Sequence, residues 1–118
     1  MMKGDYMNKD TFQNIFSEII NDILPKYLGK SINTLMQGVE NEILEISDNY
    51  ILILSARSPS KKPRKVYFAD FEKIWKKEIH GKTLAELGRI NHGRVIQAIF
   101  CLHPKIAYDF TSQTIYLR

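Results

Sequence analysis

The chain has 118 residues, enough for one domain with a buried core but too few for two full domains. Its composition, 44% hydrophobic and 25% charged residues, is close to the globular average and argues against disorder. With a net charge of +4, a single cysteine and no apolar run long enough for a signal peptide or a membrane span, the sequence predicts a cytoplasmic protein without disulfides or a membrane partner.

The first predicted element is an amphipathic helix that begins near Asp10 and ends near Gly29. Asp10 and Gln13 match a capping box, and Pro25 is predicted to kink or shorten the last turn. Its broad apolar stripe packs onto the rest of the domain in one interpretation and forms a homodimer interface in the other. The stripe consists of Phe12, Ile15, Phe16, Ile19, Ile20, Ile23, Leu24, Tyr27 and Leu28.

A β-hairpin is predicted next, because residues 42–47 and the β-rich run 50–55 flank the turn-forming pair Asp48-Asn49. The second strand is apolar on both faces, which predicts a strand that is central or covered on each side. Acidic residues crowd this region, but no Asp/Glu-x-Lys pattern follows on the apolar strand, as a nuclease would require. We interpret Glu40, Glu42 and Glu45 as protection of a sheet edge.

The segment 57–65 is strongly basic and is predicted to be a loop, because it contains two prolines. It is interpreted either as an arm that contacts phosphates or as a solvated linker. Residues 1–56 hold four Lys/Arg against eight Asp/Glu, a balance of −4, whereas residues 57–118 hold thirteen against five, a balance of +8. Such segregation is typical of a polyanion-binding face, although it also suits an acidic protein partner. The cations of the segment are Arg57, Lys61, Lys62, Arg64 and Lys65.

Residues 66–118 predict a helix, a short helix, a third helix and a hairpin. The first helix ends near Gly81, and Thr83 with Glu86 forms a capping box that opens the short helix. Asn91 is predicted to cap the third helix, and the hairpin pairs 106–110 with 114–117. Apolar residues expected to be buried in these helices are Phe68, Phe71, Ile74, Trp75, Ile79, Leu84, Leu87, Val95, Ile96, Ile99, Phe100 and Leu102.

A short capped helix, a turn and a longer helix with a polar outer face are what a helix-turn-helix needs. Arg94, Gln97 and Cys101 are predicted to lie on that outer face, with Asn91 and His92 at the helix start. Arginine can pair with guanine and glutamine with adenine, so Arg94 and Gln97, together with Asn91 and His92, are the candidates for base readout. Cys101 is interpreted as inert.

This order of elements resembles the winged-helix superfamily and, more loosely, the winged-helix modules of restriction enzymes and other prokaryotic defence proteins. The resemblance covers about half of the chain and is carried by Phe68–Trp75, Thr83–Leu87 and Arg94–Ile99. It implies that the hairpin is a wing and that the protein binds duplex DNA, as a regulator or as the recognition domain of a prokaryotic defence system. The expected phosphate contacts are Arg57, Lys61, Lys62, Arg64, Lys65, Arg89, Lys105, Ser112 and Gln113.

Nothing in the sequence predicts an enzyme. His80, His92 and His103 lack the spacing of metal ligands, and there is no glycine-rich phosphate loop, so no metal or cofactor is expected. The predicted fold is α+β, a single domain over 1–118 with a helix-and-hairpin subregion (1–56), a basic loop (57–65) and a winged-helix subregion (66–118). The alternative function is a protein-interaction module, such as a phage-type inhibitor that binds an acidic surface of a nucleic-acid enzyme.

Overall fold

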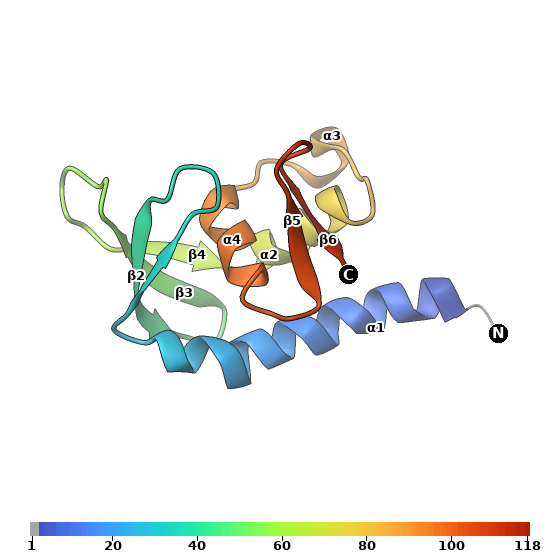
Figure 1. Cartoon of the computed structure of the whole chain (residues 1–118), viewed down its shortest axis with the longest axis horizontal. Coiled ribbons are helices and arrows are strands. Elements are labelled where there is room, and N and C mark those ends of the chain that lie inside the picture. The colour runs from blue at the N-terminus through green and yellow to red at the C-terminus, as the bar shows by residue number, and fades with distance from the viewer. Residues whose placement is uncertain (1–2) are drawn as a thin grey trace.

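The chain forms a mixed α+β structure, as the sequence predicted. A long helix, a four-stranded antiparallel sheet in place of the predicted two-stranded hairpin, further helices and a terminal hairpin follow one another along it (Figure 1). The computed structural model describes the backbone of residues 3–118 and the side chains of residues 11–118. No helix in this described part combines the length and the apolar composition needed to cross a membrane.

The N-terminal helix α1 spans Lys3–Glu18 and continues as a π-helical segment, η1 (Ile19–Ile23), and a 3-10 turn, η2 (Leu24–Tyr27). The predicted capping-box start is wrong, because α1 runs through Asp10 without interruption. The predicted effect of Pro25 is confirmed: it has no N–H to continue the α-helical ladder, and it occupies the start of the 3-10 turn. Of the apolar stripe, Phe12, Ile15, Ile19 and Leu24 are buried within the chain itself.

The sheet has the strand order β1-β2-β3-β4, with all neighbours antiparallel, and its strands are β1 (Ser31–Asn33), β2 (Glu40–Ile46), β3 (Tyr50–Ser55) and β4 (Arg64–Tyr67). The predicted hairpin and the central place of β3 are confirmed. The interpretation of Glu40 and Glu42 as protection of a sheet edge is wrong, because β1 pairs with both residues and makes β2 an internal strand. The predicted loop 57–65 includes two residues too many, because Arg64 and Lys65 belong to β4 and pair with Ile53 and Leu52. Pro63 has no N–H to donate, but it precedes the paired residues, so the sheet loses no hydrogen bond.

The C-terminal elements follow in the predicted order: α2 (Phe68–Glu78), α3 (Leu84–Leu87), α4 (Gly93–Phe100) and the hairpin of β5 (Ile106–Asp109) with β6 (Thr114–Leu117). The predicted capping box of α3 is confirmed, because the Glu86 N–H donates to Thr83 Oγ1 at 3.3 Å and the Thr83 N–H donates to Glu86 Oε2 at 2.8 Å.

Two details of this region were predicted wrongly. Leu84 is 53% exposed and Leu87 is only half-buried, because α3 is a single turn that stands away from the core. The residue that caps α4 is His92 rather than Asn91. His92 has a left-handed backbone, with φ 59° and ψ 35°, and makes no side-chain capping bond, so α4 begins without the expected polar cap.

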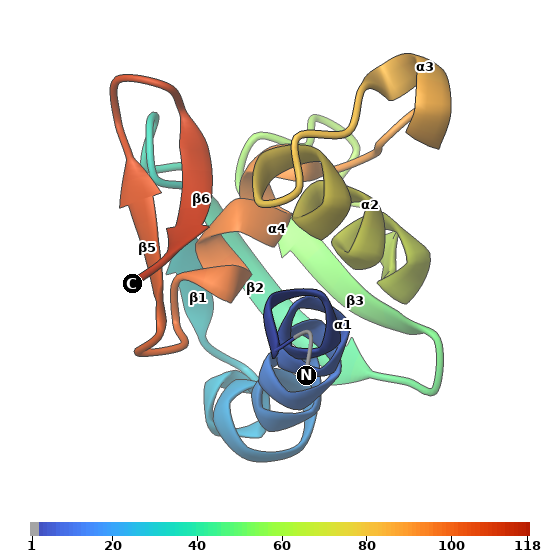
Figure 2. The ribbon, with the colours of Figure 1, turned by 90° about the vertical axis from the view of Figure 1, so that its right-hand side faces the viewer.

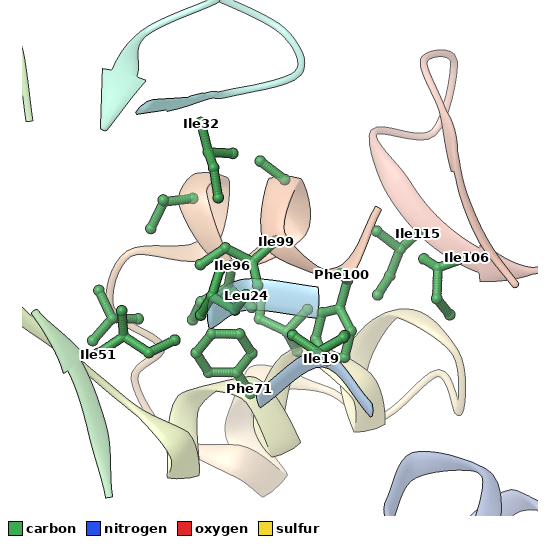
Figure 3. Packing of buried hydrophobic residues seen from close by; sticks show 14 of the residues in the cluster. Ile19, Leu24, Ile32, Ile51, Phe71, Ile96, Ile99, Phe100, Ile106 and Ile115 are labelled. Carbon is green, nitrogen blue, oxygen red and sulfur yellow. The ribbon is translucent and has the colours of Figure 1, made fainter. Parts of the chain in front are cut away.

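The core lies around α4 and takes residues from both halves of the chain (Figure 3). Phe71 from α2 and Ile51 from β3 lie on one side of Ile96, and Ile106 and Ile115 of the hairpin lie beside Phe100. Residues of α1 and η2 complete the cluster, with the Phe12 ring 5.4 Å from that of Trp75. The sheet, the hairpin and the helices therefore hold α4 in one place, and only its N-terminal end reaches the surface.

Candidate functional site

Helix α4, which was predicted to expose a recognition face, lies in the interior. In Figure 2 it lies between α2 and the hairpin β5–β6, with α1 below it. Every residue from Val95 to Phe100 is buried, and Gln97 is only 4% exposed. The prediction that Gln97 lies on an outer face is therefore wrong, because the hairpin covers the side of the helix that the sequence pattern leaves polar. Gln97 is not accessible to a base edge.

Gln97 instead forms the centre of a polar network between α2, α4 and the hairpin. Its Nε2 donates to Glu78 Oε1 at 3.0 Å, to Glu78 Oε2 at 3.1 Å and to the Gln113 carbonyl at 2.9 Å. Glu78 Oε1 also accepts the Ile115 N–H at 2.9 Å. Because the Nε2 group faces only acceptors, the orientation of the amide is determined, and its Oε1 points toward Arg94.

Arg94 is exposed at the start of α4, and the same network holds its guanidinium group. Nη2 donates to Gln113 Oε1 at 3.0 Å, while Nη1 lies 3.4 Å from the Tyr108 hydroxyl and 3.5 Å from Gln97 Oε1. A guanidinium group has five N–H donors, so these three contacts leave others for a ligand. Arg94 is thus presented at the surface in one orientation, as bidentate recognition of a phosphate or a base requires.

A first cleft, of about 640 Å³, lies between α2, α3, the start of α4 and the hairpin tip. Three cations line it: Lys77, Arg89 and Arg94. The only carboxylate in its lining is Glu78, whose oxygens already accept the hydrogen bonds from Gln97 and Ile115. The electrostatic field in this cleft therefore favours an anion.

A second cleft, of about 370 Å³, lies on the other side of the α4 start, against the loops that precede β2 and β4. Arg57, Arg64 and Arg94 line it, and no Asp or Glu does. Arg57 Nη1 donates to Gln37 Oε1 at 2.9 Å, which holds that side chain at the rim. Gly93 and Arg94 belong to both clefts, so the two cationic hollows adjoin each other. In Figure 1 the loops and helix ends that form them lie along the upper side of the molecule. We name Arg57, Arg64, Lys77, Arg89 and Arg94 the Arg94 surface.

His92 lines the second cleft, and its pKa is lowered below the usual value by burial, then by the positive charge of Arg64, with Asp70 acting in the opposite direction. The neutral ring is therefore favoured in the folded protein. A histidine whose folded pKa is lowered contributes stability above its unfolded pKa, and this contribution is lost as the pH falls through the folded pKa.

Replacement of His92 by glycine tests both properties of this residue. Glycine adopts a positive φ without strain, so His92→Gly is expected to increase the free energy of unfolding at neutral pH by up to about 1 kcal/mol. It is also expected to lose less stability than the wild type on acidification to about pH 5, because the neutral ring is gone. Urea unfolding of both proteins at the two pH values measures this, and an equal loss of stability in both would contradict it.

The structure brings some of the predicted site residues together and separates others. Eight of the predicted residues line one or both clefts, although Gln97 is buried: Arg57, Arg64, Arg89, His92, Arg94, Gln97, Ser112 and Gln113. Lys61 instead lines a small hollow with Glu40 and Glu42, and the Lys65 ammonium group lies 4.8 Å from the centre of the Tyr50 ring, on the outer side of the sheet. The remaining predicted residues, Asn91, Lys62 and Lys105, are exposed and line neither cleft.

Sequence reasoning missed Lys77, Glu78 and Tyr108 as site residues. The sequence contains one signal for Glu78. Glu78 continues the helical spacing of the buried residues Phe71, Ile74 and Trp75 along α2, so its carboxylate is expected to face inward. A charged residue in such a place needs a partner, and Gln97 occupies the matching polar position on α4.

Two other titratable side chains of this half of the chain, His103 and Cys101, lie in or against the core. His103 is buried, with Nδ1 accepting the Lys105 N–H at 3.1 Å and Nε2 3.1 Å from Glu18 Oε1, so it joins the hairpin base to α1. Burial, with a smaller effect of Glu78, raises the pKa of the Cys101 thiol to about 11, which favours the unreactive protonated form. Within the described part of the chain, no group of three His, Cys, Asp or Glu residues is placed to hold a metal ion.

The sequence matches no family model, no curated protein and no solved structure. The charge and the geometry of the site are therefore the observations that bear on function.

Proposed function

We propose that this protein binds duplex DNA through the Arg94 surface, as a non-enzymatic binding protein. One observation carries the proposal: two adjoining clefts share Arg94 and together present five Lys/Arg side chains against one carboxylate, Glu78, which is already hydrogen-bonded. An uncompensated concentration of positive charge of this kind is the electrostatic footprint of a polyanion-binding protein.

The type of cation supports phosphate as the ligand group. Four of the five members of the Arg94 surface are arginines, whose planar guanidinium groups match phosphate oxygens in a bidentate manner. Duplex DNA carries one negative charge for about every 1.7 Å of its axis, so it can neutralise cations in two neighbouring clefts at once. A single small anion would occupy one cleft only.

The geometry supports a role for the start of α4 rather than for its face. The first turn of a helix presents unpaired N–H groups that favour an anion, and Arg94 projects from this turn. The hairpin orients the Arg94 side chain through Gln113 and Tyr108, and its own residues can contact the DNA as well. The winged-helix assignment stays a prediction. Because Gln97 is buried, the proposal places the DNA contacts at the N-terminal end of α4 and not on its face.

A binding titration with paired variants tests the proposal. Fluorescence anisotropy with a labelled random duplex is expected to show micromolar non-specific binding that weakens steeply as salt rises. The double variants Arg57→Ala/Arg64→Ala and Lys77→Ala/Arg89→Ala each remove two cations from one cleft. Each is expected to lower the slope of log K against log salt by about two and the affinity by about tenfold.

The matched control is Lys26→Ala/Lys30→Ala, which removes the same charge from two exposed lysines outside both clefts. It is expected to bind as tightly as the wild type, because its lysines belong to the acidic half of the chain. Equal weakening in all three double variants would mean that net charge, rather than the Arg94 surface, determines binding. Absence of wild-type binding at moderate salt would end the DNA proposal in favour of an acidic protein partner.

A further inference from the structure

An aromatic side chain projects from the tip of the terminal hairpin. Phe110 is 60% exposed, the highest exposure of any large hydrophobic residue whose side chain the structure describes. It begins the loop between β5 and β6, directly after the last residue of β5, and its ring packs against the ring of Tyr108. The two rings meet edge to face, with centroids 4.8 Å apart.

The loop that carries Phe110 is held by its own hydrogen bonds. The Gln113 N–H donates to the Asp109 carbonyl at 2.7 Å, and the Thr111 N–H donates to Asp109 Oδ1 at 2.9 Å. The Ser112 and Thr114 hydroxyls lie 2.6 Å apart. Because the loop and the ring are already ordered, contact with a ligand through Phe110 costs little conformational entropy.

The position of the loop connects Phe110 with the Arg94 surface. Ser112 and Gln113, from the same loop, line the first cleft, and Tyr108 joins the Phe110 ring to Arg94 through its hydroxyl group. The hairpin tip and α3 rise toward the same side of the molecule in Figures 1 and 2, and the first cleft lies between them. A nucleic-acid backbone held by Arg94 therefore passes close to the exposed ring.

We infer that Phe110 stacks on a base that has left the duplex stack, and that the protein favours duplexes with a weakened base pair, such as a mismatch or a helix end. This inference rests on the proposed DNA binding. Every base offers an aromatic face, and apolar side chains next to phosphate contacts can wedge between base steps. Unstacking costs a few kcal/mol in a paired duplex and less at a mismatch, so the ring gives a preference for the mismatched substrate.

Two duplexes of identical length, which differ only by one central mismatch, test the inference by anisotropy. The wild type is expected to bind the mismatched duplex about tenfold more tightly than the paired one. Phe110→Ala is expected to lose this preference and to bind the mismatched duplex about tenfold more weakly. Phe110→Trp is expected to keep the preference, and 2-aminopurine placed at the mismatch is expected to brighten on binding to the wild type but not to Phe110→Ala.

The control is Tyr116→Ala, which removes another exposed aromatic ring from the same hairpin. Tyr116 is 48% exposed and alternates with the buried Ile115, so it lies on the opposite face from Tyr108. It is expected to leave both affinities unchanged. If the wild type binds both duplexes equally, or if Phe110→Ala keeps the preference, the inference is overturned while the proposed DNA binding stands. If the wild type binds neither duplex, both fail together.

Discussion

Reversal of one charge, in the variant Arg94→Glu, is expected to reduce DNA affinity by at least about a hundredfold, or roughly 2.7 kcal/mol. Arg94 is the one charged residue common to both clefts, so a carboxylate in its place repels phosphate in each of them. The double variants described above remove charge from one cleft at a time and leave the other intact. Arg94→Glu therefore has the larger effect, measured by anisotropy at moderate salt.

Two further variants separate the charge of residue 94 from its structural role. Arg94→Gln keeps a donor for the Gln113 amide but carries no charge, and it is expected to bind about tenfold more weakly than the wild type. Arg118→Glu reverses a charge on an exposed residue outside both clefts and is expected to bind almost as well as the wild type. If Arg94→Glu and Arg118→Glu weakened binding to the same extent, Arg94 would have no special place in it.

The largest expected effect on stability comes from Gln97→Leu, with a loss of about 2–3 kcal/mol in the free energy of unfolding. Leucine fills a similar volume but cannot donate to the Glu78 carboxylate or to the Gln113 carbonyl. Both acceptors then stay in a part-buried place without that partner, which costs more than the hydrogen bonds contribute. Urea unfolding, followed by tryptophan fluorescence of Trp75, measures the change.

A double-mutant cycle with Glu78→Gln shows whether the loss arises from this pair. Glu78→Gln alone is expected to cost about 1 kcal/mol, since an amide oxygen can still accept the Ile115 N–H but without the charge. In the double variant no carboxylate is left unpaired, so its cost is expected to be smaller than the sum of the single costs by about 1 kcal/mol. Strict additivity would show that Gln97 stabilises the fold by other contacts.

Much of the fold could be predicted from the sequence because its signals are local. The Thr83 and Glu86 capping box acts over three residues, and the hairpin around Asp48 and Asn49 needs only two alternating runs and a turn. The elements that were missed depend on distant partners. β4 forms because Arg64 and Lys65 meet β3, and nothing within the basic segment itself indicates this pairing.

The site was less predictable than the fold for the same reason. Arg94, Arg57 and Arg64 could be identified from charge, but their grouping around the start of α4 depends on tertiary contacts between separate elements. Gln97 was assigned to the surface because a polar residue on an amphipathic helix is usually exposed. The hairpin and the Glu78 carboxylate cover it, and both come from elements that lie far from it in the sequence.

The interior position of α4 also determines when this protein can fold during its synthesis. Helix α1 and the sheet leave the ribosome first, and their apolar residues, such as Ile19, Ile32 and Ile51, have no cover until α4 and the hairpin follow. Loop-closure entropy must be lost before these distant segments meet, which slows folding. The emerging N-terminal half therefore exposes apolar surface until synthesis has passed the hairpin, and its two edge strands, β1 and β4, are the ones open to pairing with other chains.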